Sequence, residues 1–516
     1  MTYANHPIFY FALAVLITAG VSAQTAPSDS LFSVDQVVTV NLTFADPDFW
    51  NTLTTHYTND VGETLTADVT VTDLTGSHTY SSVEVDLKGN STYGHPGNKK
   101  SFKIDFNDNI SGQKYHGMTK AHFNNCFKDP TFMREKVFFD YAREQGVLAP
   151  RVSYANVSMN GTFWGFYDMV EPVDKNFLDR WVDDNNGNLF KAGDNFGGGP
   201  SGSGNAADMA YYGTDQNNYS AKYELKTNET ENDWSDLLAL LDLLNNSNAA
   251  DLQSQYPQQW EWNPMLRSLA LDNMFSNLDS YINSARNYYL YHDSTTFKWN
   301  WIKWDGNEAF GSYGAQGVGN LLDLAPNYVA SGRPHLSKIF NNGGLYHDYE
   351  VQYCAALGNF NSSYLDPKID VLKTLIQDHV AADPNKQYTT AQFTLNIEGN
   401  ITTGGGPGGG TIFGLKSFIA SRSGYLNGAI DCNTLGVDEL NNDELIVYPN
   451  PTSGSVLIRS NVPLSAANIQ MFDMLGRSLS FSFSANIIDI STYASGTYVA
   501  RVLENGRMHQ VRIMKH

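Results

Sequence analysis

Cysteine is scarce in this chain, whose 516 residues include only Cys126, Cys354 and Cys432. At most one disulfide can form, and at least one thiol is left over. The spacing of the three cysteines matches no metal site. The fold must therefore rest on packed hydrophobic cores rather than on a disulfide framework.

Positive charge is also in short supply. The 33 lysines and arginines are outnumbered by 54 aspartates and glutamates, which gives a formal net charge of −21. A negative charge of this size opposes phosphate backbones and argues against nucleic acid as a partner. An acidic surface that keeps the protein soluble explains the charge equally well.

Long apolar stretches are missing after the first residues. Residues 8–20 are almost wholly apolar, and Val21-Ser22-Ala23 supplies small residues at the positions that a signal peptidase reads. We therefore expect a signal peptide over residues 1–23, a mature chain that begins near Gln24, and export from a bacterial cytoplasm, although the residues before Ile8 include no lysine or arginine. A membrane anchor is the alternative, but the stretch is short for a bilayer. No later segment is long enough, so we expect no transmembrane segment after cleavage.

The remaining composition indicates folded domains. Hydrophobic residues make up 41% and aromatic residues 13% of the chain, and its length favours two or more domains. Strand-like runs alternate with turns from residue 32 to 106, at 37–42, 67–71, 83–87 and 101–106.

A helix and a hairpin are predicted next. Asp129-Pro130 provides an N-cap and a first-turn proline for a helix that runs through Gln145 and is stopped by Gly146. The turn Asn160-Gly161 then joins strands at 152–159 and 163–170.

The following region has helical periodicity, at 234–244, 263–278 and 364–382, with strands expected at 288–291 and 299–303. Two glycine-rich tracts, 194–206 and 404–410, are interpreted as loops. Beyond a linker over 431–446, residues 447–516 predict a small all-β sandwich with strands at 455–458, 468–472, 497–502 and 509–513.

Acidic and amide side chains gather around the two strands near residue 300. A helix ending near Leu278 places Asp279 in a loop, and one hairpin later the chain presents Asp305 at the same end. Phosphoryl transfer needs such a pair: one carboxylate for the acceptor hydroxyl and another, with an amide oxygen, for a divalent metal. Asp and Asn in loops are more often turn formers. The full set is Asp272, Asn273, Asn277, Asp279, Asn283, Asn287, Asp305, Asn307 and Glu308.

Several separate motifs between about Val37 and Tyr425 resemble the CotH kinase family, which is named for a spore-coat protein and related in fold to protein kinases. The motifs are Lys88-Gly89-Asn90-Ser91-Thr92 with Asn98-Lys99-Lys100-Ser101-Phe102, Asp129-Pro130-Thr131-Phe132-Met133-Arg134, Asn160-Gly161-Thr162-Phe163-Trp164-Gly165-Phe166-Tyr167 leading to Glu171, Tyr223-Glu224-Leu225-Lys226-Thr227-Asn228, Asn277-Leu278-Asp279-Ser280, and Trp304-Asp305 with Phe310-Gly311. The resemblance implies an α+β fold: an atypical kinase-like two-lobed domain over 31–430, followed by the small all-β sandwich.

The resemblance also implies roles for individual residues, with ATP and Mg²⁺ or Mn²⁺ as cofactors. The acceptor would be a hydroxyl on a protein or another surface molecule. The turn from Lys88 through Ser91 to Thr92 would lie over the phosphates, Asp279 would be the catalytic-loop carboxylate and Asp305 a metal ligand. The remaining implied positions are Lys100 as the phosphate-pairing lysine, Glu135 as its partner, Glu171 at the hinge, and Asn283 or Asn287 as an amide ligand of the metal.

Two departures from the family pattern keep other functions open. The family's turn is similar to Trp-Asp-x-Asp, but Asn307 stands here in place of the second carboxylate, with Glu308 beside it to compensate. Lys88 replaces a common arginine and loses the bidentate fork. The alternatives are a catalytically silent kinase-like surface or binding protein, and an exported carbohydrate-binding protein.

The final 70 residues resemble the type A sorting domain of type IX secretion. The motifs are Val447-Tyr448-Pro449-Asn450-Pro451-Thr452-Ser453-Gly454, Phe472-Asp473-Met474-Leu475-Gly476-Arg477 and Ser495-Gly496-Thr497-Tyr498-Val499. This resemblance implies the type IX secretion machinery as a partner, and passage through the outer membrane to the cell surface or the medium. A generic β-sandwich used for binding is the alternative.

Overall fold

The computed structural model describes residues 28–32, 35–59, 62–182, 184–193, 205–314, 318–403, 410–432, 446–448, 452, 454–459, 464–473, 477–484, 486–504 and 507–515. The expected signal peptide, most of both glycine-rich tracts and most of the linker lie outside these residues. The described part combines helices and strands, so the fold class is α+β.

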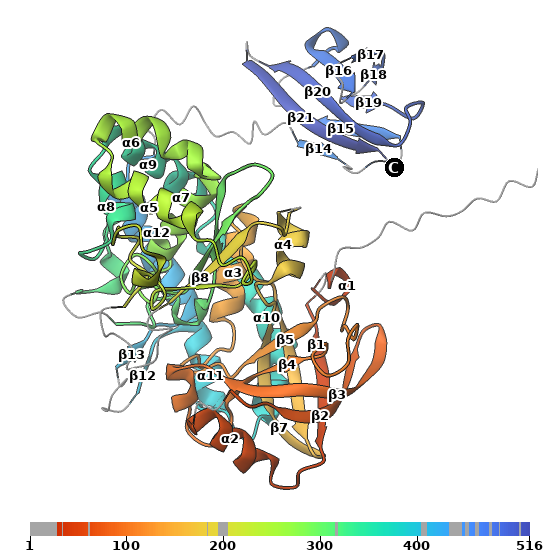
Figure 1. Cartoon of the computed structure of the whole chain (residues 1–516), viewed down its shortest axis with the longest axis vertical. Coiled ribbons are helices and arrows are strands. Elements are labelled where there is room, and N and C mark those ends of the chain that lie inside the picture. The colour runs from red at the N-terminus through yellow and green to blue at the C-terminus, as the bar shows by residue number, and fades with distance from the viewer. Residues whose placement is uncertain are drawn as a thin grey trace, which may run out of the picture.

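The largest sheet is a closed barrel in the order β1-β2-β3-β4-β5-β7-β6 (Figure 1). It closes through a parallel pairing of β1 with β6, in which Val40 lies opposite Val157. Alternate residues of β1, including Val38 and Val40, point into the barrel core because side chains alternate along a strand. The strands are β1 (Val37–Phe44), β2 (Leu65–Asp73), β3 (Gly76–Lys88), β4 (Ser101–Asp105), β5 (Lys120–Asn124), β6 (Val152–Met159) and β7 (Thr162–Val170), and the short helices α1 (Asp29–Phe32) and α2 (Phe49–Asn59) lie before β1 and β2.

The predicted strands and hairpin of this region are confirmed. Asn160 and Gly161 take φ angles of 46° and 76°, the left-handed values that a tight two-residue hairpin turn requires. The turn thus fixes the register of β6 against β7.

Helix α3 (Arg134–Glu144) starts later than predicted. Phe132 has a φ of 57°, which is incompatible with a right-handed helix, so the helical residues begin only after it. The Asp129 carboxylate still accepts hydrogen bonds from the backbone N–H groups of Met133 and Arg134, both at 2.9 Å. The helix ends as expected before Gly146, whose φ is 71°.

A second sheet and a set of helices follow the barrel. Figure 1 shows most of these helices gathered at one end of the barrel, whereas α10 (Ser362–Ala382) and α11 (Thr390–Glu398) lie beside its strands. The sheet has the order β11-β10-β8-β9, from β8 (Asn188–Ala192), β9 (Tyr223–Leu225), β10 (Tyr288–His292) and β11 (Trp299–Lys303). The helices are α4 (Lys175–Trp181), α5 (Ser235–Asn246), α6 (Ala249–Gln255), α7 (Trp262–Met274), α8 (Pro334–Phe340), α9 (Gly343–Leu357), α10 (Ser362–Ala382), α11 (Thr390–Glu398) and α12 (Leu415–Ala429), with a small ribbon of β12 (Ile401–Thr402) and β13 (Thr411–Ile412).

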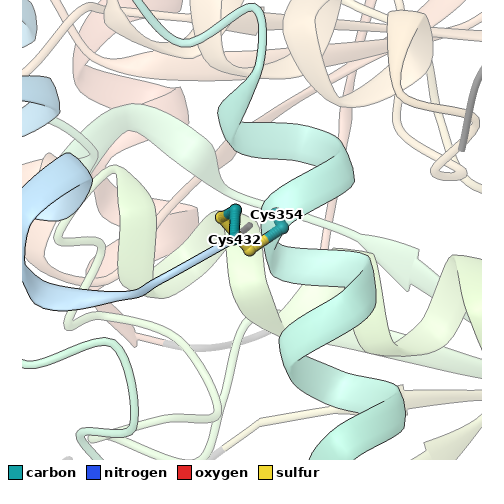
Figure 2. Close-up of a disulfide and its surroundings, with 2 residues drawn as sticks. All are labelled: Cys354 and Cys432. Atoms are coloured by element: carbon teal, nitrogen blue, oxygen red, sulfur yellow. A yellow bond between two sulfur atoms is a disulfide. The ribbon is translucent and has the colours of Figure 1, made fainter. Parts of the chain in front are cut away.

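A disulfide joins Cys354 in α9 to Cys432, just after α12 (Figure 2). The two residues are 78 positions apart in the sequence, so the bridge fastens the end of this region to its helical core. Cys126 is a free, buried thiol, and burial raises its pKa well above the usual range. One disulfide and one remaining thiol agree with the cysteine count.

The C-terminal residues form two four-stranded sheets, in the orders β14-β15-β19-β18 and β17-β16-β20-β21. Buried side chains from both sheets, among them Val456, Ile488, Met471 and Ala500, make a separate core. The all-β prediction for the tail is therefore confirmed. The strands are β14 (Ile446–Tyr448), β15 (Ser455–Arg459), β16 (Ile469–Asp473), β17 (Ser478–Leu479), β18 (Ser482–Ser484), β19 (Ile487–Asp489), β20 (Gly496–Glu504) and β21 (Arg507–Lys515).

No helix among the described residues has both the length and the apolar character to cross a bilayer.

Candidate active site

Lys88 and Glu135 come from two different elements of the barrel region. Lys88 is the last residue of β3 and its ammonium lies 5.6 Å from the centre of the Trp304 ring. Glu135 lies in the first turn of α3, where its carboxylate accepts hydrogen bonds from Asn124 Nδ2 at 2.7 Å and from the Gly306 N–H at 3.3 Å. Each of the two charged groups alters the pKa of the other.

Burial dominates both of these pKa values. It lowers the pKa of Lys88 to about 8, against the opposing attraction of Asp305 and Glu135. It raises the pKa of Glu135 to about 7, where the negative charge of Asp305 adds to the rise and Asn124 and Lys88 oppose it. The charges of Asp305 and Glu135 therefore both act on a lysine ammonium that burial shields from water.

Asp305 lies two residues beyond β11 in a left-handed conformation, with a φ of 54°. Burial raises its pKa, while Lys88, Lys191 and Arg286 oppose the rise. The next residue, Gly306, lies so close to α3 that an added Cβ would be 2.6 Å from the Phe138 ring. This glycine allows the turn that carries Asp305 to pack directly against the helix that carries Glu135.

Glu308 is a third carboxylate of this region, and its side chain is buried. One of its oxygens lies 3.3 Å from the Lys128 ammonium, and the other, Oε2, is buried with no hydrogen-bond partner among the described residues. Burial raises the pKa of Glu308 to about 7; Lys128 opposes this, and the charges of Asp279 and Asp305 add to it. Because the charges of Asp279 and Asp305 both act on Glu308, the three carboxylates belong to one region of the structure.

Asp279 lies in the loop after α7, which ends at Met274 and not near Leu278 as the periodicity predicted. Ser276, with a φ of 48°, cannot continue the helix. Asn287 Nδ2 donates to the Asp279 backbone oxygen at 2.7 Å and to its carboxylate at 3.1 Å. Arg286 Nε lies 3.7 Å from the other carboxylate oxygen. Asp279 is thus held by the two residues that precede β10.

The β10–β11 hairpin places the loop that ends at Asn287 and the turn that carries Asp305 at the same end of the sheet. Tyr288, the first residue of β10, pairs with Lys303, the last residue of β11. Residues just before β10 and just after β11 therefore emerge at the same end of the hairpin.

Two of the predicted positions, Lys100 and Asn283, have other contacts. Lys100 donates its ammonium to the backbone oxygens of Tyr93 and His95, each at 2.7 Å, so the expected pair of Lys100 with Glu135 does not form. Lys88 is instead the lysine whose charge acts on Glu135. The side-chain oxygen of Asn283, Oδ1, accepts a hydrogen bond from the Tyr328 hydroxyl at 2.9 Å.

Glu171 makes a buried ion pair with Arg151, whose Nε donates to it at 3.0 Å. This contact fastens the segment after β7 to the start of β6. Ser91 is exposed at the first position of the 3₁₀ turn Ser91–Gly94, and Asn307 is half-buried in the 3₁₀ turn Gly306–Glu308.

Sequence reasoning missed Asn124, Lys128, Lys191 and Arg286, which come from four separate segments. For Arg286 a signal existed, since it adjoins the predicted Asn287 in the same loop. Lys191 lies on β8, which pairs directly with β10, but only the sheet order reveals that neighbourhood.

The donor set of this cluster suits a hard divalent cation. Burial raises the pKa of both Asp305 and Glu308, and one buried oxygen of Glu308 has no hydrogen-bond partner in the described part of the chain. Carboxylate and amide oxygens are the ligands that Mg²⁺ and Mn²⁺ prefer. A bound cation would remove the cost of burying these negative charges.

Comparison with known proteins gives two family matches. A family described as CotH kinase protein matches residues 85–426, and the secretion system C-terminal sorting domain matches residues 446–516. The inner spore coat protein H of Bacillus subtilis (strain 168) is 27% identical over 316 residues, which are 60% of this chain and 82% of that protein. The sorting domain indicates export by type IX secretion, to the cell surface or the medium.

Proposed function

The chain belongs to the CotH kinase protein family, and we propose that it is an exported kinase. It would transfer the γ-phosphoryl group of ATP, with Mg²⁺ or Mn²⁺, to a hydroxyl on a protein or another surface molecule. The barrel and the helical region would act as the two lobes of a kinase-like domain.

One observation carries the proposal: Lys88, Glu135 and Asp305 influence one another although they come from β3, α3 and the turn after β11. In kinase chemistry a strand lysine binds phosphate oxygens, a helix glutamate orients that lysine and an aspartate holds the metal. The effects of a helix glutamate and a turn aspartate on the Lys88 ammonium support this assignment.

The roles follow from the contacts of each side chain. Lys88 binds a phosphate oxygen, and Glu135 holds the lysine in place. Asp279 accepts the proton of the acceptor hydroxyl, while Asn287 fixes the orientation of its carboxylate through the 3.1 Å hydrogen bond.

The metal would be held by Asp305 and Glu308, with Asn307 as an amide ligand between them. A divalent ion neutralises charge on the phosphates. Asn287 is the better candidate for an amide near Asp279, because Asn283 is bonded to Tyr328.

A catalytically silent scaffold is the main rival, and Asn307 is the residue that favours it. Glu308 weakens that rival, since it supplies a buried carboxylate one residue away. The proposal therefore depends on Glu308 taking the part that an aspartate at position 307 would play.

Transfer of label from γ-labelled ATP tests the proposal. The full chain is incubated with labelled ATP and either Mn²⁺ or Mg²⁺, alone and with serine-rich peptides, and incorporation is measured. Asp305→Asn should reduce incorporation by about 100-fold or more, because an amide binds a divalent cation weakly. Asparagine tolerates the left-handed φ of 54°, so the turn should keep its shape.

Asp323→Asn is the matched control, since Asp323 is an exposed carboxylate in another 3₁₀ turn. Its activity should equal that of the parent chain. A folded parent chain that neither binds nucleotide nor incorporates label would refute the kinase proposal and leave the silent scaffold.

A further inference from the structure

A second group of metal-binding side chain types lies on the barrel, away from the carboxylate cluster. Asp73, His78 and His116 each offer one ligand atom, and these atoms all lie within 4.8 Å of one another. Asp73 Oδ2 is 2.7 Å from His116 Nε2 and 3.6 Å from His78 Nε2. Ligands of a tetrahedral zinc ion with bonds of about 2.0–2.1 Å are roughly 3.4 Å apart. The two distances from Asp73 lie on either side of that spacing, and the two imidazole nitrogens lie within 4.8 Å of each other.

Two tight turns bring the three residues together. Asp73 ends β2 and His78 lies near the start of β3, so both belong to the same hairpin end. His116 lies in the turn between Tyr115 and Met118, which pair with each other, and it takes a left-handed φ of 49°. A left-handed histidine is uncommon and shows that the turn is specifically shaped at this residue.

Asp73 is a charged ligand at neutral pH. Burial works to raise its pKa, but hydrogen bonds from Thr75, His116 and Tyr115 outweigh burial and hold the pKa well below its usual range. The Asp73 side chain is 1% exposed, His116 is 12% exposed and His78 is 33% exposed. The cluster is therefore fixed from the inside and open to solvent on the His78 side.

We propose that Asp73, His78 and His116 form a zinc site that leaves a fourth position to solvent. Two imidazoles and one carboxylate suit Zn²⁺ and similar transition metals, whereas Mg²⁺ prefers oxygen ligands alone. This site is chemically different from the carboxylate cluster, and it does not depend on the proposed kinase activity.

The two sites lie at opposite ends of one strand. His78 and Lys88 are ten residues apart on β3, which at about 3.3 Å per residue separates them by roughly 30 Å. Zinc at this place cannot share ligands with Asp305. It would instead clamp the β2–β3 hairpin to the 115–118 turn.

The proposed zinc site is also connected by hydrogen bonds to the first described residues of the chain. The backbone oxygen of His116 accepts a hydrogen bond from the Ser28 N–H at 2.5 Å. Ser28 Oγ in turn accepts a hydrogen bond from Arg151 at 2.5 Å. Fixing the His116 turn would therefore also steady the segment that leads into β1.

The test is a zinc titration of the metal-free full chain in excess Mg²⁺, with a chromophoric zinc indicator as competitor and the melting temperature as second readout. The parent chain should bind one equivalent tightly and melt at a higher temperature with zinc. His78→Ala should lower the affinity by at least about tenfold and lose the zinc-dependent rise in melting temperature.

Three further variants complete the test. His116→Asn should behave like His78→Ala, and asparagine accepts the left-handed φ at that position. His56→Ala is the matched control, because His56 is a barrel-region histidine paired with Glu63 at 3.3 Å, and it should bind zinc normally. Asp305→Asn should also retain zinc binding.

Equal zinc affinity in the parent chain, His78→Ala and His116→Asn would overturn the proposal. Loss of zinc binding in Asp305→Asn would overturn it too, because the ion would then belong to the carboxylate cluster. Each variant's melting temperature without zinc shows that it is folded.

Discussion

The carboxylates of Asp383 and Glu308 are both buried, but their surroundings differ. Asp383 accepts hydrogen bonds from the Lys99 ammonium at 2.6 Å, the Phe166 N–H at 3.1 Å and the Asn385 N–H at 2.8 Å. Glu308 has one ion-pair contact, with Lys128 at 3.3 Å, and its second oxygen has no hydrogen-bond partner among the described residues.

The difference separates structural from functional use of buried charge. Burying a carboxylate is costly unless hydrogen bonds and an opposite charge compensate for the lost water. Lys99 and Asp383 meet that condition and join the barrel to the end of α10. The cluster around Glu308 does not, and groups with such strongly shifted pKa values concentrate at functional sites.

The largest effect is expected from breaking the structural pair. Lys99→Met would leave Asp383 buried without its counter-charge, and we expect the free energy of unfolding to fall by about 3–5 kcal/mol. Urea denaturation at neutral pH measures this. Lys103→Met is the control: Lys103 pairs with Asp86 at 3.0 Å, the two side chains are 39% and 30% exposed, and its loss should cost less than about 1 kcal/mol. Equal losses of stability in the two variants would show that the buried pair stabilises the fold no more than the exposed pair does.

A smaller effect, with the opposite sign, is expected at Glu308. Its pKa rises from 4.5 to about 7 on folding, so the folded state favours the protonated form. The stability that the protonated Glu308 contributes to the folded state is fully present below pH 4.5 and is lost as the pH rises through 7. Without metal, Glu308→Gln should therefore be more stable than the parent chain at pH 8, by up to about 3 kcal/mol, and nearly equal to it at pH 4.5.

Thermal or urea melts in a chelating buffer at the two pH values measure this difference. A Glu308→Gln chain that is less stable than the parent at pH 8 would show that Glu308 is a satisfied structural carboxylate like Asp383.

The smallest effects distinguish the two lysines near the phosphate turn. Lys88→Met should lower phosphoryl transfer by about 100-fold, because the Lys88 ammonium is the one on which the charges of Asp305 and Glu135 act. Lys100→Met should change the rate less than about threefold, since its ammonium is bound to two backbone oxygens. Rates of label transfer at saturating ATP measure both variants, and a greater loss in Lys100→Met would restore the role first expected for Lys100.

Local signals in the sequence were sufficient to predict most of the helices and strands. The Asn160-Gly161 turn and the alternating pattern of β1 depend on neighbouring residues only, and both predictions are confirmed. The start of α3 depends instead on the left-handed Phe132, which no propensity predicts.

The site was less accessible to sequence reasoning, because its geometry depends on contacts between distant segments. Lys88 pairs with Ser101 across β3 and β4, so Lys100 lies just outside the strand, where its ammonium binds the backbone oxygens of Tyr93 and His95. Asn283 and Asn287 are equivalent candidates for the amide ligand in the sequence. Only the contact of Asn283 with Tyr328, 45 residues away, distinguishes them. The Asp73, His78 and His116 group was missed for the same reason.

The most direct test of the account is the melting temperature of the parent chain and of Asp305→Asn at pH 8, with ATP in a chelating buffer and with ATP plus Mn²⁺. The account predicts a rise that needs both ATP and Mn²⁺, is absent in Asp305→Asn and is retained in Asp323→Asn, because only ligands that bind the folded state raise stability. An equal rise in Asp305→Asn, or no rise in the parent chain, would contradict the claim that these carboxylates hold a metal and a nucleotide.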